Sequence, residues 1–115
     1  MQQSAVSPTY FCAVEPDRDR VVVRVGGELD LNVAPDVAAT VDELLDADFS
    51  RILVDLREVT FLDSAGVHML VAAHCSAERH DVRLSLVAVS PRVHRVLDLT
   101  ATASLLAIDS PGAET

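Results

Sequence analysis

The chain has 115 residues, of which 50% are hydrophobic, 23% charged and only 3% aromatic, so one compact domain fits and two do not. Without Trp, the interior must be filled by Val, Leu, Ile and Ala, which favours layered α/β packing over an antiparallel sandwich built on large rings. A net charge of −9, from 18 acidic and 9 basic residues, argues against nucleic acid and against an anionic membrane surface as partners.

Both ends of the chain are poor in core-forming residues. We expect residues 1–8 and 109–115 to be flexible tails around a single folded domain at 9–108. The amino-terminal stretch lacks the apolar core of a secretion signal, and no apolar run approaches the roughly 20 residues that span a bilayer. These features predict a soluble, cytoplasmic protein.

The first half of the domain predicts two strands and a helix. Residues 10–14 form a short apolar run and residues 21–25 a β-branched one, which Gly26-Gly27 is expected to end. A turn joins these two strands. Apolar residues recur at helical spacing over residues 35–47, which predicts an amphipathic helix with Asn32 as a candidate cap.

The middle of the chain predicts a buried strand followed by a second helix. Residues 51–56 are almost continuously apolar, as expected near the centre of a sheet that helices cover. A loop over residues 57–62 then leads to an Ala-rich helix at 64–79. Its apolar stripe contains Val67, Leu70, Val71, His74 and either Ala77 or Glu78.

The last part predicts a strand at 82–89, a short helix from Ser90-Pro91 to about Leu97, and a final strand at 105–108. The whole order is β-β-α-β-α-β-α-β. It predicts an α/β fold with right-handed crossovers and a mixed, mostly parallel sheet on which the helices pack. Because such sheets host many activities, function must be argued from particular residues.

The most informative segment runs from Leu53 to Val67, where a strand and a loop lead to Asp63-Ser64 at a helix start. A serine there is expected to cap the helix, which stabilises it by about 1 kcal/mol and needs no further function. The same place suits a phosphate on Ser64, because a helix N-terminus presents free N–H groups and about +0.5 charge. Phosphorylation would add about −1.5 to −2 charge to an acidic surface and weaken an interface there.

Three motifs occur in a fixed order along the chain: Gly27-Glu28-Leu29-Asp30, the stretch from Asp55-Leu56 to Phe61-Leu62-Asp63-Ser64-Ala65-Gly66, and Ser90-Pro91-Arg92-Val93 with Leu97. Together they resemble the bacterial anti-sigma factor antagonists, members of the STAS domain family, over most of the chain. The resemblance implies a single STAS-like domain that works by binding another protein.

The resemblance also implies a switch. The unphosphorylated chain would bind an anti-sigma factor that is also a serine kinase of the GHKL type, and so release a sigma factor. The kinase would then phosphorylate Ser64 with ATP, which ends binding, and a separate serine phosphatase would reset the chain. By position, Asp30, Asp63, Ala65 and Gly66 surround the phosphosite. The expected partner contacts are Glu28, Asp30, Asp63, Ser64, Val67, His68 and Met69.

Two residues depart from the pattern of the family. Ala65 stands where Ser or Thr is common, which leaves Ser64 as the only hydroxyl at this point of the motif. His68 stands where a small residue is common. One turn after Ser64, its imidazole would either contact a phosphate or the partner, or be an ordinary exposed polar residue.

Other readings stay open beside the switch. Ser64 and His68 with Asp30 or Asp63 suggest a small serine hydrolase, but the Gly-x-Ser-x-Gly motif is missing and the chain leaves little room for a substrate pocket. The histidines and cysteines lack the spacing of a metal site, so no bound metal is expected. We also expect no cofactor and no catalytic residue. A STAS module that works without a kinase, or that binds a small ligand, is the stronger alternative.

Overall fold

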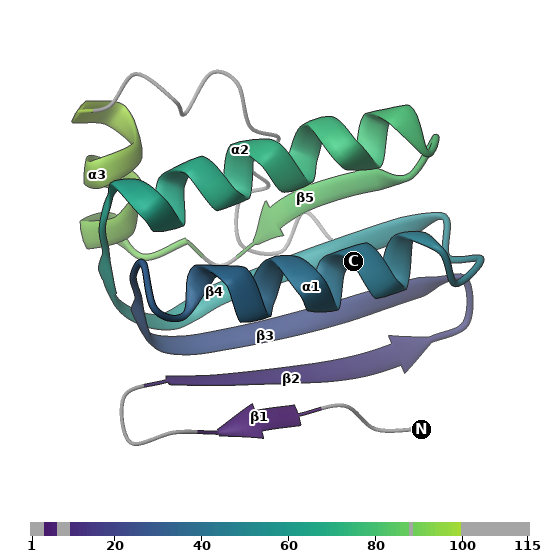
Figure 1. The fold of residues 1–115 in the computed structure, drawn as a ribbon, viewed down its shortest axis with the longest axis horizontal. Helices are drawn as coiled ribbons and strands as arrows, with labels where there is room; N and C mark the ends of the chain where they lie inside the picture. The colour runs from purple at the N-terminus through teal and green to yellow at the C-terminus, as the bar shows by residue number, and fades with distance from the viewer. Residues whose placement is uncertain (1–3, 7–9, 88, 100–115) are drawn as a thin grey trace.

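Five strands form one mixed sheet in the computed structural model, which describes residues 4–6, 10–87 and 89–99 (Figure 1). Their spatial order follows the chain: β1 (Ser4–Val6), β2 (Tyr10–Asp17), β3 (Arg20–Leu29), β4 (Arg51–Leu62) and β5 (Arg83–Val87). The pairs β1–β2 and β2–β3 are antiparallel, whereas β3–β4 and β4–β5 are parallel. The predicted α/β fold, with a mixed sheet and a parallel centre, is confirmed.

Three helices accompany the sheet in the part of the chain that the structure describes, and all three were predicted. α1 (Ala34–Leu45) connects β3 to β4, α2 (Ser64–Arg79) connects β4 to β5, and α3 (Pro91–Leu99) follows β5. α1 and α2 lie side by side on the sheet, and α3 lies at the end where α2 begins (Figure 1). α3 starts as its Ser-Pro pattern predicts, since the Ser90 Oγ accepts a hydrogen bond of 3.2 Å from the Val93 N–H.

The core lies between the sheet and these helices. Alternate strand residues such as Val21, Val23 and Ile52 are fully buried, and Val37 and Leu70 bring the apolar faces of α1 and α2 onto them. Burying each such side chain stabilises the fold by about 1.5–3 kcal/mol. The stripe predicted for α2 was partly wrong, because Met69 and Ala73 are buried while Val71 and His74 are only half-buried.

Two strands extend past their predicted ends. Gly26 and Gly27 do not end β3; they sit where the β3–β4 register shifts, and Gly27 has φ 85°. The positive φ of Gly27 favours glycine at the irregularity, and a Cβ on Gly26 would meet the Phe11 ring at 2.2 Å, so that ring would have to shift. Likewise, the predicted loop at 57–62 belongs to β4, which pairs with the second half of β3.

The chain ends differ from expectation at one point. Ser4–Val6, in the predicted tail at 1–8, form a short strand that pairs with β2. The polar residues 1–8 as a whole gave no strand signal, because an edge strand of three residues depends on backbone pairing more than on apolar side chains. The predicted strand at 105–108 and the tail at 109–115 lie outside the described residues.

Candidate functional site

The candidate site lies where two parallel strands end together. Leu29 of β3 pairs with Leu62 of β4, so Asp30 and Asp63, which follow directly, reach the same edge of the sheet. In open α/β sheets the carboxyl ends of parallel strands are where binding sites usually form. Asp30 and Asp63, predicted from distant motifs, are thus brought to one corner of the molecule.

Asp63, not Ser64, caps α2. Its carboxylate accepts hydrogen bonds from the Gly66 N–H at 3.0 Å and from the Leu31 N–H at 3.3 Å. The backbone N–H of Asp63 also donates to the Leu29 carbonyl at 3.4 Å. The prediction that Ser64 is the cap was therefore wrong by one residue. One side chain holds both the start of α2 and the loop after β3.

This assignment predicts which of two neighbouring substitutions destabilises the domain. Asp63→Ala should lower the free energy of unfolding by about 1–2 kcal/mol, because the Gly66 and Leu31 N–H groups lose their acceptor. Ser64→Ala should change it by less than about 0.5 kcal/mol, since Ser64 is exposed and not the cap. Urea unfolding followed by circular dichroism measures both. A larger loss for Ser64→Ala than for Asp63→Ala would contradict the assignment.

Asp30 shapes the turn that leads into α1. Its Oδ1 accepts from the N–H groups of Asn32 and Val33 at 3.0 and 3.2 Å, and its carbonyl accepts from Ala34 at 2.8 Å. Asn32 is exposed, and Val33 occupies the cap position without a side-chain hydrogen bond, so the expectation of an Asn32 cap was wrong. Instead, an Asx turn at Asp30 supplies the hydrogen-bond acceptor before α1.

Ser64 is the first residue of α2, and its side chain is exposed. Helix geometry leaves the N–H groups of Ser64 and Ala65 without carbonyl acceptors inside the helix, while that of Gly66 is taken by Asp63. An enzyme can therefore reach the hydroxyl. A phosphate bonded to it would sit at the positive end of the helix, where anions are stabilised.

The predicted partner contacts differ in accessibility. Glu28, Ser64 and His68 are exposed, and Asp30 and Asp63 are half-buried. The other two are each only 5% exposed: Val67 belongs to the core, and Met69 borders the groove described next. Two apolar side chains that were not predicted flank the same corner, Leu31 at 70% and Phe61 at 50% exposure. The sequence did not predict the exposure of Leu31 and Phe61, because only the fold brings these two residues to the corner where β3 and β4 end.

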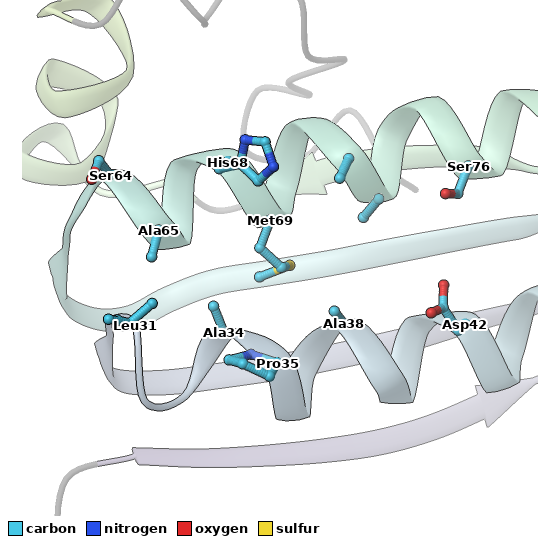
Figure 2. A pocket seen from close by; sticks show the side chains of 12 residues that line it. Leu31, Ala34, Pro35, Ala38, Asp42, Ser64, Ala65, His68, Met69 and Ser76 are labelled. Carbon is cyan, nitrogen blue, oxygen red and sulfur yellow. The ribbon is translucent and has the colours of Figure 1, made fainter.

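A groove of ≈ 640 Å³ runs between α1 and α2, and Ser64 stands at one end of it (Figure 2). Small side chains line both walls, among them Ala34 and Ala38 on α1 and Ala65 and Ala72 on α2. Figure 2 shows Met69 pointing from α2 toward α1 and Asp42 pointing from α1 toward α2. The sequence did not predict this groove, because its walls come from two helices that become neighbours only after folding.

The hydrolase reading lacks geometric support. Among the hydrogen bonds of the described residues, none joins the Ser64 hydroxyl to His68 or joins His68 to a carboxylate. A nucleophile needs its base within hydrogen-bond reach.

The described residues supply neither a buried thiolate nor a metal site. Burial raises the pKa of the Cys12 thiol, which keeps that thiol protonated. Within ranges 4–6, 10–87 and 89–99, no group of three His, Cys, Asp or Glu side chains could hold a metal ion, and no helix is long and apolar enough to cross a membrane.

Comparison with known proteins gives consistent matches. The family model for the STAS domain matches residues 10–111. The anti-sigma-B factor antagonist of Listeria monocytogenes is 29% identical over 94 residues, which cover 82% of each chain. The anti-sigma-B factor antagonist of Staphylococcus aureus is 28% identical over 87 residues, covering 76% of this chain and 81% of the relative.

Solved structures match in fold. A crystal structure of an anti-sigma factor antagonist from Mycobacterium paratuberculosis has a TM-score of 0.78 at 25% identity, over 90% of this chain and 89% of that one. The antagonist SpoIIAA in its unphosphorylated form has a TM-score of 0.71 at 21% identity, over 99% and 90% of the two chains. Its phosphorylated form, from Bacillus, has a TM-score of 0.66 at 20% identity, over 99% and 94%.

Proposed function

Because the chain belongs to the STAS domain family, we propose that it is an anti-sigma factor antagonist whose binding to an anti-sigma factor ends when Ser64 is phosphorylated. The observation that carries this proposal is the exposed Ser64 hydroxyl on the first residue of α2, directly after the capping Asp63. The names of the relatives from Listeria and Staphylococcus support the role. In this role the chain would act in the cytoplasm.

The partner is an anti-sigma factor of the GHKL type that is itself a serine kinase. In the phosphoryl transfer, the Ser64 Oγ attacks the γ-phosphorus of ATP, ADP leaves, and the hydroxyl proton is lost, which gives phosphoserine. The chain contributes the acceptor and no catalytic group. A serine phosphatase hydrolyses the phosphoserine and restores the binding form.

Phosphorylation is compatible with the fold at this position. The added phosphate extends from an exposed side chain, and the free N–H groups of the first turn of α2 face it. Asp63 already holds α2 and the loop after β3, and both of its hydrogen bonds involve backbone N–H groups other than that of Ser64. We therefore assign the switch to a changed surface and not to unfolding.

Intact-mass spectrometry tests the kinase step. The wild-type chain, incubated with ATP and each GHKL-type anti-sigma kinase encoded in the same genome, should gain one phosphate with one of them. Ser64→Ala should gain none, and Ser50→Ala, which removes an exposed serine just before β4, should be phosphorylated like the wild type. If no kinase modifies Ser64, the chain is a STAS module that works without a kinase.

A further inference from the structure

We infer that the groove between α1 and α2 receives a helix of the anti-sigma partner, with apolar side chains along the groove and a basic residue facing Asp42. This inference rests on the proposed function and names the surface that would hold the partner beyond Ser64. It follows from the shape, the lining and the charge of the groove, taken in turn.

The groove has the length of a helix segment. On α2 its lining extends from Ser64 to Ser76, twelve residues apart, which corresponds to about 18 Å along the helix axis. A helix of about three turns spans that distance. Alanines on both walls allow the side-chain ridge of a partner helix to approach α1 and α2 closely.

Its lining is mainly apolar and is continuous with the phosphosite. Leu31 stands at the Ser64 end and is 70% exposed, and its backbone N–H donates to the Asp63 carboxylate. Leu31 is thus held next to Ser64 by its backbone, and among the described residues its side chain is largely uncovered. Large apolar side chains held in this way act as anchors at protein interfaces.

The charge of the groove selects the kind of helix. Among the described residues that line the groove, Asp42 is the only acidic one and none is an Arg. Asp42 points across toward α2 (Figure 2). A partner helix that covers Asp42 must supply a cation, because a carboxylate buried without a partner is costly. The matching segment is an amphipathic helix with an apolar ridge and one Arg or Lys near the end farthest from Ser64.

This arrangement also explains how a phosphate would end binding. A helix lying in the groove covers its Ser64 end, where Leu31 provides an apolar contact. A dianionic group there would have to lose its water beneath the partner. The phosphate therefore acts at one end of a longer surface, and the rest of that surface can be tested without changing Ser64.

The test fills the groove from an exposed position. Ala72→Phe on α2 should weaken binding of the unphosphorylated chain to its anti-sigma kinase by roughly tenfold or more, because the ring occupies the space of the partner helix. Ala39→Phe is the matched control, since Ala39 is an exposed alanine of α1 that does not line the groove. It should bind like the wild type. Isothermal titration calorimetry measures both dissociation constants.

Charge reversal tests the other end. Asp42→Arg should weaken binding by roughly tenfold, whereas Glu43→Arg, an exposed neighbour outside the lining, should have less than about a threefold effect. If the wild type binds the kinase, and Ala72→Phe and Asp42→Arg bind it as tightly as the wild type does, the groove is not the docking surface. The inference is then overturned, while the proposed function stands. A change in self-association confined to Ala72→Phe, measured by sedimentation, would assign the groove to a second copy and also overturn it. If wild type binds no anti-sigma kinase, the proposed function itself fails.

Discussion

Gly66→Ala is expected to lower the free energy of unfolding by about 2–3 kcal/mol, although alanine is normally the better helix former. A Cβ at Gly66 would lie 2.5 Å from the Leu29 carbonyl oxygen and 2.6 Å from the Leu62 Cδ1. The leucine side chain can move, but the carbonyl belongs to β3 and accepts from the Asp63 N–H. Chemical denaturation followed by circular dichroism gives the value.

A control on the same helix isolates the cause. His68→Ala alters an exposed residue two positions on and should change stability by less than about 0.5 kcal/mol. If Gly66→Ala were as stable as the wild type, α2 would not start against the end of β3. The geometry that places Ser64 at this corner would then be wrong, independently of any partner.

Ser64→Asp is expected to weaken partner binding by about 10- to 100-fold while leaving the fold as stable as before or slightly more stable. A full switch from 99:1 bound to 1:99 requires about 5.5 kcal/mol, and one carboxylate carries only part of the charge of a phosphate. At the first residue of α2, the same charge favours the helix by about 0.3–1 kcal/mol. Binding and stability should thus change in opposite directions.

Two variants separate charge at Ser64 from other effects. In Ser64→Asn the new side chain has nearly the size of the Asp side chain without its charge. This variant should therefore lose less affinity for the partner than Ser64→Asp does. Ala47→Asp adds the same charge at an exposed position before β4, at the opposite edge of the sheet, and should not affect binding. Equal affinities for Ser64→Asp and Ser64→Ala would show that charge at this position does not control the partner.

The fold was predictable because its signals are local. Continuous apolar strands and helical periodicity predicted β2 to β5 and all three helices. Predictions failed where tertiary contacts decide. Gly26 and Gly27 looked like a strand end, yet they allow a register shift against β4 that no local pattern encodes. β1 is held by pairing with β2 and not by its composition.

For the candidate site, the sequence predicted which residues meet at one corner but not the contacts that they make there. The motifs identified Asp30, Asp63 and Ser64 from distant parts of the chain, and the parallel pairing of β3 with β4 explains why the two aspartates share a corner. Which of two adjacent polar residues caps α2 depends on backbone geometry at a single residue. The groove escaped prediction altogether, because its walls come from two helices whose alanines become neighbours only after folding.

Addition of ATP to a preformed complex of this chain with the proposed anti-sigma kinase tests whether phosphorylation of Ser64 ends binding. Size-exclusion chromatography with intact-mass detection should show the wild-type chain leaving the complex as it gains one phosphate on Ser64. The Ser64→Ala chain should remain bound under the same conditions. Phosphorylated wild type that stays in the complex with undiminished affinity would contradict the account.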